Sequence, residues 1–143
     1  MDIRKIDDTI SVAPQISVED VAEIARLGYR TLVANRPDQE EFGQPLMSDI
    51  EAAARQQGLN WVYMPVESGN ITDHDVDQFA PMIRDADKPV LAFCRSGTRC
   101  TVLWALSAAR NSGAEEIFTK ARNAGYDITP LAPRLAQQAQ HRD

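Results

Sequence analysis

The chain has 143 residues, of which 43% are hydrophobic and 25% charged, and its formal net charge is -6. This length and composition suit one globular domain over residues 1–143 with a core of its own. The acidic balance argues against nucleic acid or an acidic membrane surface as a partner, and no stretch is long enough to cross a membrane. The first residues do not read as a secretory signal, and two cysteines cannot form a disulfide framework, so the expected location is the cytoplasm.

Hydrophobic patterning predicts strands that alternate with helices. In chain order we expect a strand at residues 9–13, a helix at 17–27, a strand at 30–34, a helix at 47–57 and a strand at 60–66. Next we expect a helix that begins at 72–75 and a strand at 90–93. Three more helices should follow, one that ends at about residue 110, one from 112–115 to 125 and one from 130 toward 138. This alternation predicts a single-domain, three-layer α/β fold, with a mostly parallel central sheet and helices on both faces.

The strand at residues 90–93 is apolar without alternation, which is typical of a central strand covered on both sides. It runs directly into a short polar loop that begins with Cys94, and an apolar helix follows. Ligands of such sheets bind beyond the carboxyl ends of the strands. Backbone N–H groups and the dipole of the next helix converge there and favour an anion. A thiol in that field ionises readily, so Cys94 is the candidate nucleophile.

The residues after Cys94 supply the expected anion-binding groups. The amide donors are those of Ser96, Gly97, Thr98 and Arg99. The Arg99 guanidinium also offers a planar two-donor fork to an oxyanion. Arg95 either faces outward and reads the substrate or pairs with an acidic neighbour. The alternative for Cys94 is a buried core cysteine, which is a common environment for a free thiol, but the two arginines and the glycine around it favour a reactive one.

Four segments in this order resemble the beta-lactamase-hydrolase-like protein family, whose domain is described as phosphatase-like. The segments are residues 11–16, 31–38, 63–66 and 89–99, within a match from Ile10 to about Arg110. The resemblance implies a fold like that of the protein-tyrosine and dual-specificity phosphatases, with Cys94 as nucleophile and Arg99 as oxyanion binder. Members of this family also occur fused to or beside sulfur-oxidising enzymes, which implies persulfide chemistry and a sulfur-oxidation enzyme as a partner.

The cysteine loop departs from the tyrosine-phosphatase pattern of histidine, cysteine, five intervening residues and arginine. Phe93 replaces the histidine, and only four residues separate Cys94 from Arg99. The segment Cys-Arg-Ser-Gly-Thr-Arg resembles the short active-site loop of rhodanese sulfurtransferases. A shorter loop directs fewer backbone amides inward. Such a loop suits a single sulfane sulfur on the thiolate better than a tetrahedral phosphoryl group.

A general acid is missing from its usual place. Cleavage of a phosphate ester needs an acid to protonate the leaving alkoxide, and dual-specificity phosphatases carry an aspartate for this on the rim loop upstream of the cysteine. The corresponding loop, residues 65–70, contains no aspartate, and Glu67 is the one nearby acid. Asp73 and Asp75 are more simply residues that begin a helix. Sulfur transfer needs no such acid, because a thiolate or sulfite leaves as an anion.

Two residues near the loop have two interpretations each. Cys100 stands where the longer loop would end. It either replaces the hydroxyl that commonly follows the arginine and stabilises the thiolate, or it is a resolving thiol for oxidised Cys94. Arg36 either lines the rim of the pocket or belongs to an ordinary turn. The acidic pair Glu40 and Glu41 is expected in solvent.

The leading hypothesis is a rhodanese-type sulfurtransferase that takes sulfane sulfur from thiosulfate or a persulfide and carries it as a Cys94 persulfide. The alternative is a protein-tyrosine or dual-specificity-like phosphatase that cleaves a phosphate ester through a Cys94 phosphoenzyme. The third class is a non-catalytic anion or persulfide sensor. No cofactor is expected in any of them, and no metal site, because His74 and His141 are isolated and show no ligand spacing with the cysteines.

Overall fold

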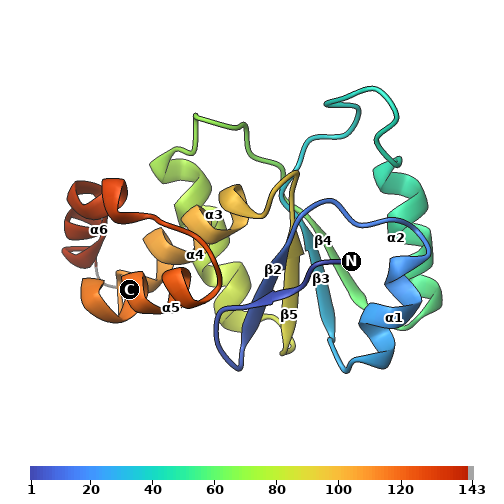
Figure 1. Cartoon of the computed structure of the whole chain (residues 1–143), viewed down its shortest axis with the longest axis horizontal. Helices are drawn as coiled ribbons and strands as arrows, with labels where there is room; N and C mark the ends of the chain where they lie inside the picture. Colours follow the sequence, from blue (N-terminus) through green and yellow to red (C-terminus); the bar gives the residue numbers. More distant parts are fainter. Residues whose placement is uncertain (142–143) are drawn as a thin grey trace.

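A five-stranded sheet runs through the middle of the molecule, in the strand order β1-β2-β5-β3-β4 (Figure 1). The computed structural model describes residues 1–141. The strands are β1 (Arg4–Lys5), β2 (Ile10–Ala13), β3 (Thr31–Ala34), β4 (Asn60–Tyr63) and β5 (Val90–Phe93). Strands β2, β5, β3 and β4 are parallel, whereas β1 pairs antiparallel with β2. The predicted α/β class with a mostly parallel sheet is therefore confirmed. The two-residue β1 was not predicted, because so short a strand carries no hydrophobic period.

Strand β5 occupies the centre of the sheet, between β2 and β3, as its unbroken apolar run predicts. Its four residues are fully buried and alternate between two hydrophobic cores, one on each face. Phe93 pairs in register with Ala13 of β2 and with Ala34 of β3, so these three strands end at one level. The residues that follow them therefore share one edge of the sheet.

Helices cover both faces of the sheet (Figure 1). They are α1 (Asp20–Arg26), α2 (Met47–Gln56), α3 (Asp73–Asp85), α4 (Thr98–Ala108), α5 (Ala114–Asn123) and α6 (Ala132–Ala139). Helices α1 and α2 pack into one core with residues such as Leu91 and Phe93, and the other four share the second core with Val90 and Ala92. A short 3₁₀ turn at Thr129–Leu131 precedes α6. Within residues 1–141, none of these helices has the length and apolar character needed to span a membrane.

Two element boundaries differ from the prediction by three residues each, at the start of α1 and at the end of β4, and local hydrogen bonds account for both. The helix predicted from residue 17 begins at Asp20. The amide of Asp20 donates to Ser17 Oγ at 3.2 Å, and the amide of Ser17 donates to Asp20 Oδ2 at 2.8 Å, so these reciprocal bonds hold the turn that leads into the helix. The strand predicted to reach residue 66 ends at Tyr63, because the chain then turns and the Val66 amide donates to the Asn35 carbonyl at 3.1 Å.

Candidate active site

Cys94 begins the loop between β5 and α4, at the edge where β2 and β3 also end. Its amide donates to the Ala13 carbonyl at 3.3 Å, which ties the loop to β2. Gly97 then adopts a φ of +91°, a left-handed conformation that suits glycine, and turns the chain into α4. In this bend the Gly97 amide donates to Cys94 Sγ at 3.1 Å. The local fold therefore aims a backbone donor at the sulfur.

The Cys94 thiol is fully buried, yet it is acidic. Its pKa falls from 9.0 to about 6, chiefly because the Cys100 thiol donates a hydrogen bond to it; the backbone amides of Cys100, Gly97 and Arg99 add to this, and burial opposes it. Burial beside Cys94 raises the pKa of Cys100, so Cys100 stays a protonated donor. A core thiol in apolar surroundings has its pKa raised instead. The lowered pKa of Cys94 therefore favours its thiolate form at neutral pH, and Cys100 is placed to act as the hydrogen-bond donor.

Replacing Cys100 with alanine should raise the pKa of Cys94 by about one unit or more, because a hydrogen bond to a charged group contributes roughly 1.5–3 kcal/mol. The midpoint of thiolate formation would then move upward from about pH 6. Ultraviolet absorbance of the thiolate, taken as the difference from a Cys94→Ser protein, measures this midpoint. Cys100→Ser is the matched control, since its hydroxyl keeps a donor. An unchanged midpoint in Cys100→Ala would contradict this role for Cys100.

Arg99, the second residue of α4, is held by a carboxylate from a distant loop. Its Nη1 and Nη2 donate to the two carboxylate oxygens of Glu40 at 2.8 and 2.7 Å, and Nη1 also donates to the Val66 carbonyl at 3.0 Å. The hydrogen bond from Arg99 is the main reason that the pKa of Glu40 falls to about 2. The prediction that Glu40 is simply solvated is therefore wrong, because the loop that carries it returns to the cysteine loop.

Arg99 keeps two donors for a ligand. A guanidinium has five N–H donors in one plane. Within residues 1–141, Arg99 donates three hydrogen bonds, two to Glu40 and one to Val66. These bonds use both hydrogens of Nη1 and one hydrogen of Nη2. The Nε hydrogen and the second Nη2 hydrogen remain, and together they form a side-on fork that matches two oxygens of an oxyanion. Glu40 therefore orients Arg99 without using all of its donors.

The loop that carries Glu40 and Glu41 also contacts Arg36 and Arg95. Arg36 is 1% exposed and donates from Nε to Glu40 at 2.8 Å and from Nη1 to Gln15 at 3.0 Å. Arg36 is not among the residues that line the cavity, and its buried guanidinium holds Glu40 in place. Arg95 is exposed and pairs with Glu41 at 3.3 Å. It also lines the cavity beside the loop, so both of its expected roles remain open to it.

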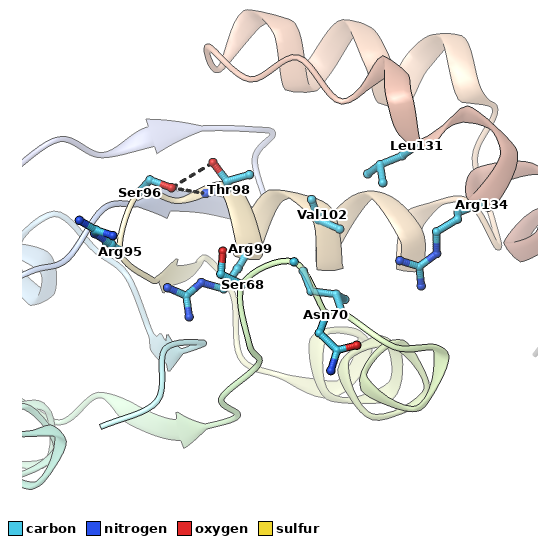
Figure 2. Close-up of a pocket in the computed structure, with 11 residues that line it drawn as sticks. Ser68, Asn70, Arg95, Ser96, Thr98, Arg99, Val102, Leu131 and Arg134 are labelled. Carbon is cyan, nitrogen blue, oxygen red and sulfur yellow. Dashed lines mark hydrogen bonds between the residues drawn. The ribbon is translucent and has the colours of Figure 1, made fainter. Parts of the chain in front are cut away.

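A cavity of about 710 Å³ lies beside the cysteine loop (Figure 2). Its walls come from residues 68–71, from Arg95, Ser96, Thr98, Arg99 and Val102, and from Leu131 and Arg134. Ser96 and Thr98 are coupled to each other, because Ser96 Oγ donates to Thr98 Oγ1 at 3.0 Å and accepts from the Thr98 amide at 3.3 Å. The fully buried Cys94 is not part of this lining, so the loop around the sulfur forms the wall of the cavity.

The described lining contains no acidic side chain. Glu67 is exposed, and its carbonyl accepts from the Asn70 amide at 3.1 Å in a tight turn, but its side chain is not brought into the cavity. Asp75 forms the expected cap of α3, because it and Thr72 exchange hydrogen bonds at 2.9 and 3.2 Å. Over residues 1–141, no three His, Cys, Asp or Glu side chains gather as metal ligands would.

Three residues with charged or hydroxyl-bearing side chains at the site were not found from the sequence: Glu40, Tyr126 and Arg134. Tyr126 Oη donates to the Ser96 carbonyl at 3.0 Å and so holds the cysteine loop from the C-terminal part of the chain. Each of the three lies far from Cys94 in sequence, and none belongs to a motif. Hydropathy patterning reads such residues as surface positions, so it offers no signal that would have found them.

The α/β fold, with its mostly parallel sheet, is the one that solved protein-tyrosine-phosphatase-like structures share. A Neisseria meningitidis protein described as a "putative phosphatase" is 38% identical, and its crystal structure matches with a TM-score of 0.84 over 96% of this chain and 99% of its own. The core catalytic domain of the PP-IP phosphatase Siw14 from S. cerevisiae shares the fold at 18% identity, with a TM-score of 0.68 over 100% of this chain and 86% of that one.

The chain belongs to the family described as "Beta-lactamase hydrolase-like protein, phosphatase-like domain", whose model matches residues 2–111. The resemblance that four sequence segments indicated is thereby confirmed. The beta-lactamase hydrolase-like protein of Xylella fastidiosa (strain Temecula1) is 33% identical over 141 residues, which are 97% of this chain and 33% of that protein. The chain thus spans about a third of the length of the curated relatives it matches.

Proposed function

We propose that this domain is a cysteine-dependent phosphatase, a hydrolase of phosphate monoesters that works through a Cys94 phosphoenzyme. One arrangement carries the proposal: an acidic Cys94 sulfur contacted by the Gly97 amide, with the oriented two-donor fork of Arg99 in the first turn of α4. The family match and the 38%-identical relative support this function over sulfur transfer, which is the leading hypothesis from the sequence.

The reaction has two steps in this proposal. First the Cys94 thiolate attacks phosphorus, the S–P bond forms, the ester P–O bond breaks, and the alcohol leaves as an oxyanion that takes a proton from water. Arg99 and the loop amides hold the non-bridging oxygens while negative charge develops on them. Then water attacks phosphorus, the S–P bond breaks, and the thiolate returns. Inorganic phosphate leaves, and the proton lost by the water passes to solvent.

Rates should fall steeply as the leaving alcohol becomes less acidic, because no carboxyl group of the described lining can protonate it. We expect kcat/KM to be about 100-fold higher for 4-nitrophenyl phosphate than for phenyl phosphate, and alkyl phosphates to be poorer still. A series of substituted phenyl phosphates measures the slope. Glu67→Gln should leave each rate within about twofold, because its side chain does not reach the cavity. Efficient alkyl ester cleavage that Glu67→Gln selectively removes would restore Glu67 as the general acid.

Trapping the phosphoenzyme tests the proposal directly. Protein quenched in acid during turnover of 4-nitrophenyl phosphate should carry one phosphoryl group on the peptide that contains Cys94, as located by mass spectrometry. Cys94→Ser should show neither the adduct nor turnover, while its circular dichroism matches that of the wild type. Turnover that survives in Cys94→Ser would rule out the thiolate mechanism.

The short loop favours a second candidate, rhodanese-type sulfur transfer. Only four residues separate Cys94 from Arg99, and a cavity lined without an acid suits a leaving group that departs as an anion. Here the thiolate would attack the outer sulfur of thiosulfate, a new S–S bond would form, and sulfite would leave with the electron pair of the old one. The same protein preparation is treated with thiosulfate, glutathione persulfide and an aryl phosphate. A sulfur adduct on Cys94 without a phosphoryl adduct would favour the sulfurtransferase, and anion binding with neither adduct would favour the sensor.

A further inference from the structure

The cavity is much larger than the group that the cysteine loop can bind. Its volume of about 710 Å³ lies in the range of sites that enclose whole small molecules. Beyond the loop the walls include the half-buried apolar side chains of Ile71, Val102 and Leu131, with the polar Ser68 and Asn70 on the side of residues 68–71. This stretch has room for an apolar body joined to the anion at the loop.

Arg134 stands at the far end of this apolar stretch. It projects from α6, and Figure 2 shows it on the opposite side of Val102 from Arg95 and Arg99. Val102 itself lies one helical turn beyond Thr98, about 6 Å along α4. The cavity therefore has cationic groups at both ends, and the α4 side of the stretch between them is apolar at Val102.

Arg134 is positioned by neighbours that leave most of its donors unused. Its Nη2 donates to Asp73 Oδ1 at 3.2 Å, and the same oxygen accepts from Gln138 Nε2 at 3.4 Å. The Asp73 side chain is 71% exposed, and such a solvated ion pair contributes little. In the described part of the chain, the bond to Asp73 is the one found for the Arg134 guanidinium, and it uses one of the five N–H donors. The guanidinium therefore stays available to a second anion.

We propose that Arg134 is a distal anion subsite, and that the substrate is an elongated phosphate monoester with an anionic group at each end. The reacting phosphate lies at the cysteine loop, an apolar or aromatic body follows the wall at Val102, and a second oxyanion, carboxylate or phosphate, binds Arg134. The identity of the reacting end rests on the proposed phosphatase function. The net charge of -6 repels a dianion overall, so its binding depends on local arginines at both ends.

Paired substrates test the subsite in the wild-type protein. They are phenyl phosphate and phenyl phosphates that carry a carboxylate or a second phosphate on a para alkyl chain of graded length. Arg134→Gln should reduce the preference for the best extended substrate about tenfold, through KM rather than kcat. Arg134→Lys should restore part of it. Arg122→Gln, which removes an exposed charge outside the cavity, should match the wild type. An Arg134→Gln protein that keeps the full preference overturns the subsite.

Binding separates the subsite from the chemistry. The matched phosphonates cannot be hydrolysed, and calorimetry measures their affinities for the wild type and for Arg134→Gln. The extended phosphonate should bind more tightly than the short one and lose about fivefold or more in Arg134→Gln. If that holds while no ester is turned over, the subsite stands and the phosphatase function fails. If esters are turned over but the two phosphonates bind alike in both proteins, the subsite alone fails.

Discussion

Gly97→Ala should lower kcat/KM by about 100-fold, because the Gly97 amide would move away from the sulfur that it now contacts. Gly97 has a φ of +91°, at which any residue with a Cβ is strained. A Cβ there would also overlap the hydroxyl of Tyr126. That hydroxyl donates to the Ser96 carbonyl at 3.0 Å, so it cannot yield without loosening the loop. We expect a loss of about 2–3 kcal/mol in the free energy of unfolding.

Gly58→Ala is the control that separates the cost of backbone strain from the cost of the overlap with Tyr126. Gly58 has a φ of +78°, but a Cβ there would meet open space, so we expect a loss of about 1 kcal/mol and unchanged activity. Adding Tyr126→Phe to Gly97→Ala removes the overlapping hydroxyl and should recover part of the lost stability. Urea denaturation and aryl phosphate turnover measure both effects. If Gly97→Ala is no more destabilising than Gly58→Ala, the contact with Tyr126 does not limit this position.

The strand, loop and helix around Cys94 were predictable because each has a local signal. The unbroken apolar run at residues 90–93 indicates a central strand, and this run fixes Cys94 at the carboxyl edge of a parallel sheet. Gly97 marks the turn into α4. These signals involve neighbours in sequence, so no tertiary information was needed to place the nucleophile beside the N-terminus of a helix.

Glu40 and Arg134 could not be predicted because their roles depend on how remote segments return to the site. Glu40 lies in irregular chain between β3 and α2, where no hydrophobic period exists. It reaches Arg99 across 59 positions of sequence. Arg134 reaches the cavity through the packing of α6 beside α4. The sequence shows only that both residues are charged, and charged residues are most often solvated.

Loop length is a weaker guide to the chemistry than it first appeared. The short spacing between Cys94 and Arg99 predicted too few inward amides for a phosphoryl group. In the structure, the backbone amides of Gly97, Arg99 and Cys100 all help to lower the pKa of Cys94. The side-on fork of Arg99 adds two more donors. The number of residues between Cys94 and Arg99 sets the length of the cysteine loop, whereas anion binding depends on the direction in which the N–H donors point.

Arg99→Lys should lower kcat/KM for aryl phosphates by about a thousandfold, whereas Glu40→Gln should lower it about tenfold. A lysine ammonium is a point charge without a planar fork, so it cannot bind Glu40 end-on and two phosphate oxygens side-on. Glu40→Gln leaves Arg99 its fork and one acceptor, but it removes the charge that fixes the guanidinium. Steady-state kinetics of both variants measure the difference. Equal losses would mean that Glu40 does more than orient Arg99.

The same ion pair should be visible in the pH dependence of stability. The pKa of Glu40 is about 2 in the folded protein and ordinarily 4.5, so its charge stabilises the fold above pH 4.5, and this stabilisation is lost as the pH falls toward 2. Because Glu40 is partly exposed, solvent screening reduces the effect to about 1–2 kcal/mol. Denaturant titrations of the wild type and Glu40→Gln should therefore differ most near neutral pH and converge in acid. A difference that stays constant would mean that Glu40 holds Arg99 by shape rather than by charge.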